Sequence, residues 1–138
     1  MKTKIENIAT IIAAAIWADG EYAPAEEVTV EEIAEALGLN LKTFKAEVDK
    51  QTKTFEKATD NQANAIMLDA AEGVAEDEIG IVFEAAMQML LADGELSRNE
   101  VSNLLVIAKA LGIETEDAIL LLADMVKEEE YLEINFED

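Results

Sequence analysis

The chain of 138 residues contains no cysteine and no histidine. Without these side chains there is no thiolate nucleophile, no imidazole base and no Ser-His-Asp or Cys-His triad. The usual zinc, haem and iron–sulfur ligand sets are excluded as well. We therefore predict that the protein is not an enzyme. The lack of cysteine is compatible with a reducing compartment.

Basic side chains are also scarce, with 10 Lys and Arg against 31 Asp and Glu, so the formal net charge is -21. A field of this sign repels nucleic acid and anionic lipid and attracts cations and basic proteins. Half of the chain is hydrophobic, which distinguishes it from acidic sequences that stay disordered. The composition predicts a folded protein whose partner is a cation or a basic protein surface, with nucleic acid disfavoured.

No apolar run approaches the roughly 20 residues that cross a bilayer. The N-terminus imitates a secretory signal, because Met1–Lys4 is basic and Ile8–Ala18 is apolar. Glu6 interrupts the imitation, and Ile79–Ala92 is a similar segment in mid-chain, where no signal peptide could lie. We interpret the segment as the first helix of a mature cytoplasmic protein.

The sequence repeats itself with a shift of 74 positions. Ten of the 25 residues from Ala15 to Leu39 are identical to those from Met89 to Ile113, including Ala-Asp-Gly-Glu and Ala-Leu-Gly. Aromatic residues are few, and the excess of Ala, Glu, Leu and Ile favours helix over strand. Each half is thus predicted to be one helical unit.

The periodicity predicts an all-α, seven-helix bundle in which two repeats pack pseudo-symmetrically. We expect one domain over residues 1–138, made of a first repeat at about 3–57, a connector helix at about 60–75, a second repeat at about 77–130 and an acidic tail at 128–138 that docks or frays. One apolar face of the first helix is formed by Ile5, Ile8, Ile12, Ala15 and Ile16.

Glycines and capping residues predict the helix ends. Gly20 and Gly94 should end the first helix of each repeat, and Gly38 and Gly112 the second. Two helices should start at Pro24, with Thr29 as an alternative cap, and at Leu41. Ser97 and Glu100 should form a capping box, and Thr115 should cap the last helix. Asp77 should cap the helix that follows the connector.

Each Asp-Gly turn carries a set of acidic residues at fixed spacing. The set consists of Asp19, Glu21 and Glu26 in the first repeat and of Asp93, Glu95 and Glu100 in the second. Carboxylate oxygens are the ligands of Ca²⁺ and Mg²⁺, and the spacing is not that of an EF-hand. An Asp at the negative end of a helix is also mildly unfavourable. We therefore predict a divalent-cation or basic-partner site, with Asp19, Glu26, Asp93 and Glu100 as its main residues and Glu21 and Glu95 as weaker candidates; a purely structural turn is the alternative.

The order of these residues resembles the TerB-like domain of tellurite-resistance proteins. Ala-Asp-Gly-Glu, an acidic residue seven positions after the Asp, and Ile-Ala-x-Ala-Leu-Gly carry the resemblance over both repeats. The resemblance implies an all-helical, non-enzymatic module, associated with divalent metal or with interaction partners, in stress-response or phage-related systems. It extends to Asp19, Glu26, Asp93 and Glu100.

Residues 29–50 also resemble a helix-turn-helix, which predicts DNA binding as an alternative function. Lys42, Thr43 and Lys45 would lie on the recognition helix, and five of the ten basic residues fall on or just after it. The whole-protein charge opposes phosphate binding. A structural or adaptor role is a third alternative, for which the sequence names no process or partner.

Overall fold

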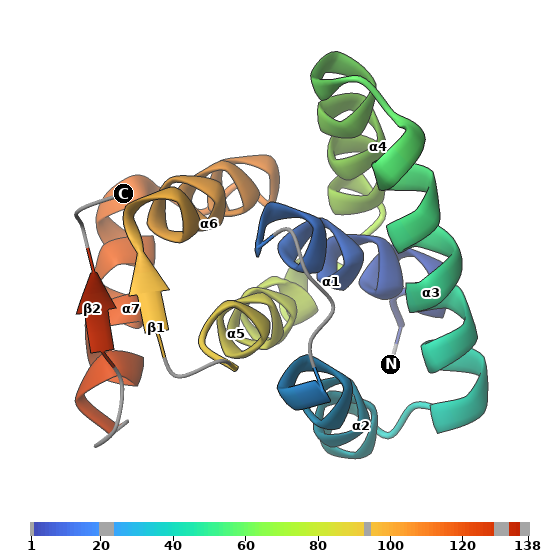
Figure 1. Cartoon of the computed structure of the whole chain (residues 1–138), viewed down its shortest axis with the longest axis horizontal. Helices are drawn as coiled ribbons and strands as arrows, with labels where there is room; N and C mark the ends of the chain where they lie inside the picture. Colours follow the sequence, from blue (N-terminus) through green and yellow to red (C-terminus); the bar gives the residue numbers. More distant parts are fainter. Residues whose placement is uncertain (1, 20–23, 93–94, 129–132, 136–138) are drawn as a thin grey trace.

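The computed structural model describes residues 2–19, 24–92, 95–128 and 133–135, which confirm the predicted all-α, seven-helix bundle (Figure 1). The helices are α1 (Ile5–Asp19), α2 (Pro24–Leu37), α3 (Leu41–Lys57), α4 (Asp60–Glu72), α5 (Ile79–Leu90), α6 (Arg98–Ala110) and α7 (Thr115–Glu128). A 3₁₀ helix, η1 (Glu76–Glu78), precedes α5, and two three-residue strands complete the fold, β1 (Glu95–Ser97) and β2 (Glu133–Asn135). No helix in the described ranges is long and apolar enough to cross a membrane.

Helix α1 is the central element of the bundle and packs against α3, α4, α5 and α6 (Figure 1). Every residue from Ile8 to Ile16 is buried. The single apolar face predicted for this helix is therefore incomplete, because the alanines on its other faces are covered as well. A helix that is apolar all round is stable in water only when neighbours surround it. The hydroxyl of Thr10 donates to the carbonyl oxygen of Glu6 at 2.7 Å, so this buried polar group remains bonded within the helix.

Helix α3 packs across α1 and is amphipathic (Figure 1). It buries Phe44, Val48 and Phe55 and exposes most of its lysines. The side chain of Asn40 caps its first turn by accepting a hydrogen bond from the amide of Thr43 at 3.0 Å. This cap explains why the helix begins at Leu41, as predicted.

The two Leu-Gly sequences end their helices in the same way. Gly38 and Gly112 have φ angles of 68° and 81°, which are accessible to glycine without a steric penalty. The amide of Leu39 donates to the carbonyl of Ala34 and that of Ile113 to the carbonyl of Ala108, both at 2.8 Å. These are the bonds of a Schellman motif, so both predicted ends are confirmed. Gly20 and Gly94 lie outside the described residues.

The third helices of the two halves pack differently. Helix α3 packs mainly on α1, whereas α7 packs on α6. The local equivalence of the turns and of the second helices therefore does not extend to the third helices, and the pseudo-symmetric packing of whole repeats stays a prediction.

The connector helix begins at Asp60, as predicted, and differs from the prediction at its C-terminal end. Helix α4 stops at Glu72, three residues before the predicted end. Thr59 and Gln62 form a capping box at its start that was not predicted. The prediction that Asp77 caps α5 is wrong, because its carboxylate instead pairs with the ammonium of Lys2 at 2.9 Å, and no side chain caps α5. Asp77 lies within η1, so Glu78 and not Asp77 occupies the N-cap position of α5.

The segment before α1 is attached to η1 by a buried carboxylate. Glu78 accepts hydrogen bonds from the amide and hydroxyl of Thr3, at 2.7 and 2.6 Å, and from the amide of Lys2 at 3.1 Å. The Thr3 hydroxyl oxygen in turn accepts a bond from the amide of Ala75 at 2.9 Å. Mainly because of the Thr3 hydroxyl, and against the opposing effect of burial, the pKa of Glu78 lies below its usual value. These hydrogen bonds from Lys2 and Thr3 therefore favour the ionised form of Glu78.

The substitution Thr3→Val should lower the melting temperature at neutral pH and make stability depend less on the protonation of Glu78. Since the pKa of Glu78 is lower in the folded than in the unfolded protein, the stabilisation is complete above roughly pH 5 and is lost as the pH falls through the folded-state value. The difference in melting temperature between wild type and variant should therefore narrow in acid. Thermal melts of both proteins from about pH 7 to about pH 3 measure this difference. Because the other carboxylates are the same in both proteins, their effect on the melting temperature cancels.

Thr43→Val, at an exposed position, is the matched control and should leave the pH profile unchanged. If the wild type and Thr3→Val differ by the same amount at every pH, the link between Thr3 and the ionisation of Glu78 is refuted.

The acidic tail was predicted either to dock or to fray, and within it residues 133–135 dock. Strand β2 pairs in parallel with β1, with Glu95 opposite Glu133 and Ser97 opposite Asn135. Strand β1 directly precedes α6, so the tail returns to the segment that connects the second Asp-Gly turn to its helix (Figure 1).

Candidate functional site

The acidic residues of the first turn are distributed between the ends of two helices. Asp19 is the last residue of α1, and Glu26 lies in the first turn of α2. Gly20 and Glu21, between the two helices, lie outside the described residues, as does the side chain of Asp19. In the second repeat Asp93 also falls outside them, and Glu95 is the first residue of β1, with a side chain that is not described.

Glu26 and Glu100 are the two predicted site residues whose side chains are described, and both are buried. They are 1% and 5% exposed, in the first turns of α2 and α6. These positions are equivalent in the repeat, seven residues after each Asp. A carboxylate removed from water is strongly destabilising unless hydrogen bonds or a cation compensate it. The N-terminus of a helix supplies part of this compensation through its amides and dipole.

The equivalence extends to the apolar residues around these carboxylates. Val30, Ile33 and Ala34 on α2 are buried, and so are their counterparts Leu104, Ile107 and Ala108 on α6. The carboxylates thus belong to the inner faces of α2 and α6. This burial separates Glu26 from the other carboxylates of α2, which are all exposed.

The described acidic residues do not gather into a complete metal site. Among the side chains in the described ranges, no group of three Asp or Glu lies close enough to hold a metal ion. Glu26 and Glu100 could each contribute one carboxylate. The remaining predicted ligands are those of the two turns.

The residues of the predicted DNA-binding helix lie on the outer side of α3. Lys42 and Thr43 are exposed. Lys45 lies against α2, where its ammonium contacts the carboxylates of Glu27 at 2.8 Å and Glu31 at 3.8 Å. The hydrogen bond to Glu27 raises the pKa of Lys45. Lys45 is therefore engaged within the protein, and DNA binding stays a prediction that rests on Lys42 and Thr43.

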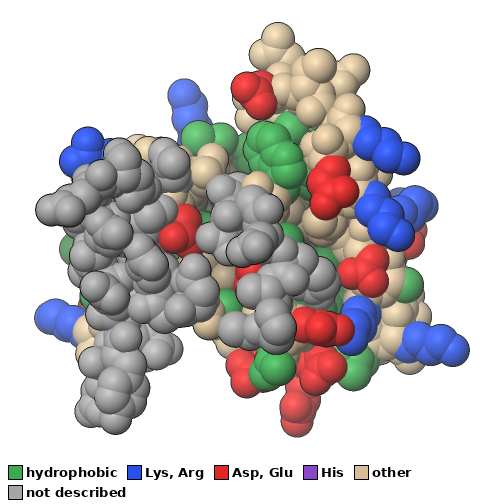
Figure 2. Space-filling model, viewed as in Figure 1, with side chains coloured by type: hydrophobic (Ala, Val, Ile, Leu, Met, Phe, Trp, Pro, Cys, Tyr) green, Lys and Arg blue, Asp and Glu red, His purple; other side chains and the backbone are tan. Residues whose placement is uncertain are grey.

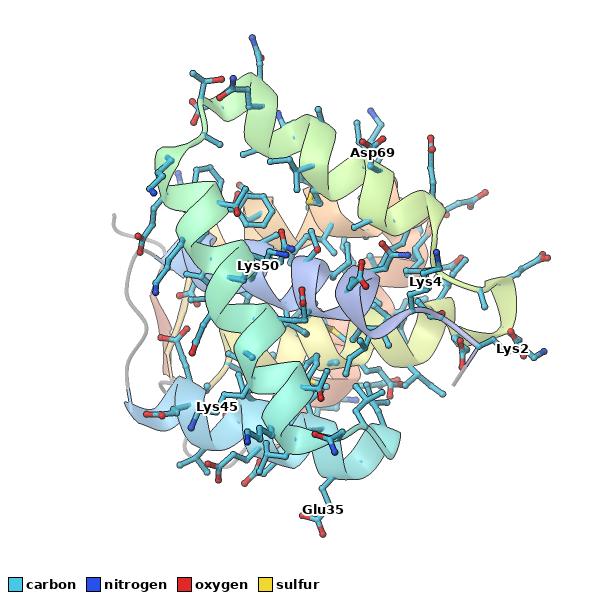
Figure 3. All side chains as sticks on the ribbon, turned by 90° about the vertical axis from the view of Figure 1, so that its right-hand side faces the viewer. Lys2, Lys4, Glu35, Lys45, Lys50 and Asp69 are labelled. Carbon is cyan, nitrogen blue, oxygen red and sulfur yellow. The ribbon has the colours of Figure 1, made fainter. Side chains whose placement is uncertain are left out.

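The lysines form the basic part of the surface. Figure 2 shows Lys and Arg side chains along the edge where Figure 1 places α3. In Figure 3, which faces this edge, Lys45 lies beside α2 and Lys50 lies further along α3. The remaining described surface carries an excess of acid, so the charge of the molecule is unevenly distributed.

A small cavity between α1, α3, α4 and α6 was not predicted. Its volume is about 30 Å³, close to the space that one water molecule needs. Trp17 and Phe55 form part of its lining, with ring centroids 5.9 Å apart and planes inclined by 27°. The cavity is too small for an organic substrate. The spacing of Trp17 and Phe55 in the sequence carries no signal that could have predicted their contact.

Comparisons with protein-family models, curated proteins and solved structures found no match to this chain. The TerB-like resemblance thus depends on the repeated motif alone.

Proposed function

We propose that this chain is a non-enzymatic, TerB-like helical module that binds a divalent cation, or a basic protein surface, through its two acidic Asp-Gly turns. The burial of Glu26 and Glu100 at equivalent positions is the single observation that supports this proposal most. The resemblance in the motif is the reason for proposing a setting in stress-response or phage-related systems.

The chemistry of the proposed site is that of hard oxygen ligands. Ca²⁺ takes six to eight oxygens at about 2.3 to 2.6 Å, and Mg²⁺ takes six at shorter distance. One buried carboxylate in each repeat, together with the Asp and Glu of its turn, supplies anionic oxygens of this kind. A basic side chain of a partner protein, placed in the same turn, would be attracted by the same carboxylates.

Titration with Ca²⁺ or Mg²⁺ should raise the melting temperature. A ligand at about one hundred times its Kd stabilises the folded state by about 2.7 kcal/mol, which corresponds to a shift of several degrees. The double variant Asp19→Asn/Asp93→Asn should lose this metal-dependent rise. NaCl at matched ionic strength separates binding from screening of the net charge.

Glu35→Gln/Glu72→Gln is the matched control, because it removes two exposed carboxylates from α2 and α4. It should keep the full metal-dependent rise. A rise that persists in Asp19→Asn/Asp93→Asn, or that NaCl reproduces, would exclude a metal site in the turns. Isothermal titration calorimetry of the wild type then gives the number of ions bound per chain, which is one for a site shared by the two turns and two for separate sites.

A further inference from the structure

Helix α7 has many more apolar residues than it buries. Eight of its fourteen residues are apolar, but only Ala118 and Leu122 are buried. Leu121, Met125 and Val126 are partly buried against the core. Helix α3, the third helix of the first half, instead buries its large aromatic residues against α1. The more apolar of the two helices is thus the less covered one.

The apolar surplus of α7 lies on one outward face. Ile119 and Leu120 are 49% and 65% exposed, and Ala123 is exposed between them and the C-terminal turn. Ile119 and Ala123 are one turn apart on the helix, and Leu120 and Ala123 are also neighbours on its surface. Single exposed apolar residues are ordinary, but adjacent ones at helical spacing are typical of an interaction surface.

Three acidic residues and one basic residue, Lys127 in the last turn, border this face, so its surroundings are acidic on balance. Asp117 and Asp124 are exposed and lie three residues before and four residues after Leu120, so both neighbour it on the helix surface. Glu116 is exposed one turn before Leu120. An apolar strip bordered by carboxylates is complementary to a partner helix with an apolar strip bordered by Lys or Arg.

We propose that the outer face of α7, formed by Ile119, Leu120 and Ala123 and flanked by Asp117 and Asp124, docks a basic amphipathic helix of a partner protein. The net charge of -21 disfavours a second copy of this chain and an anionic membrane, and it accelerates encounter with a basic partner. Figure 1 shows α7 at the edge of the molecule opposite α3, the helix that carries five of the ten basic residues. The inference does not depend on the metal site in the Asp-Gly turns.

A fluorescently labelled synthetic helix of Leu, Ala and Lys, with its leucines on one face, is a suitable probe. Fluorescence anisotropy should show that the full chain binds this peptide and does not bind the counterpart with Glu in place of Lys. Ile119→Gln/Leu120→Gln should weaken binding about tenfold, as expected when central apolar contacts are lost. Asp117→Asn/Asp124→Asn should weaken it several-fold and reduce its dependence on salt.

Two matched variants separate this face from the rest of the surface. Val28→Gln/Leu68→Gln removes apolar residues exposed to a similar degree on α2 and α4. Asp49→Asn/Asp69→Asn removes two exposed carboxylates from α3 and α4. Both should bind the basic peptide as the wild type does, and circular dichroism should show the same helix content in all four variants.

Several results would overturn the inference. Equal affinity in all variants would mean that the peptide responds only to the net charge of the protein. Absence of binding would refute the proposal that this face docks a basic amphipathic helix. A dimer of the wild type that dissociates in Ile119→Gln/Leu120→Gln would assign the face to a second copy. Binding to phosphatidylcholine vesicles that is lost in the same variant, without peptide binding, would assign it to a membrane.

Discussion

Replacing Phe55 by alanine should lower the free energy of unfolding by about 3 to 5 kcal/mol. The Phe55 side chain is 1% exposed, near the C-terminal end of α3, and stacks on Trp17 of α1. Its removal deletes a large buried apolar area and enlarges the cavity that both rings line. The surrounding helices cannot close such a space fully, so lost contacts add to the lost transfer free energy.

Urea unfolding followed by circular dichroism measures the effect of Phe55→Ala, and Trp17 fluorescence reports the loss of its neighbour. Phe55→Leu keeps most of the volume and should cost clearly less. Thr54→Ala, at an exposed position on the same turn, should change stability by less than about 0.5 kcal/mol. If Phe55→Ala destabilises no more than Thr54→Ala, the packing of α3 on α1 described above is wrong.

Enlarging Ala13 to leucine should destabilise the protein by about 1 to 3 kcal/mol, although leucine is a good helix former. Ala13 is fully buried in α1, which has helices on all sides. Three additional carbons have no space there, so neighbouring side chains must leave their preferred rotamers or a helix must move. A helix with a single apolar face would tolerate the same change on its solvent side.

Ala46→Leu is the matched control, since Ala46 is exposed on α3. The same substitution there should leave the urea midpoint nearly unchanged. Equal stability of Ala13→Leu and Ala46→Leu would contradict the burial of α1 on all sides, because the two positions would then be equivalent.

Local signals predicted the helix ends that depend on a few neighbouring residues. Pro24 begins α2 as expected, and Gly38 and Gly112 end α2 and α6, because φ restrictions and backbone bonds act within one or two turns. Asp77 shows the limit of this reasoning. Residues 76–78 form η1, which places Glu78 at the N-cap position of α5, and the Asp77 carboxylate pairs with Lys2, 75 residues away in the chain.

The sequence could single out candidate residues but not their burial. The repeat identified Glu26 and Glu100 as a matched pair among 31 acidic residues. Their burial could not be predicted, since a Glu in the first turn of a helix is usually solvated and serves the helix dipole. Burial depends on which face of α2 and α6 meets the core, and that follows from contacts between helices.

The amino-acid sequence by itself determined the helical class and most helix boundaries, because periodicity, caps and glycine conformations act over short distances, and it contains the repeated acidic motif. Only the tertiary structure decided that α1 is buried on all sides, that Glu78 holds the N-terminus and that α7 keeps an apolar face outside. These features depend on how many helices surround a given one. Apolar periodicity indicates that a face is to be covered, but what covers it is decided by contacts between residues far apart in the chain.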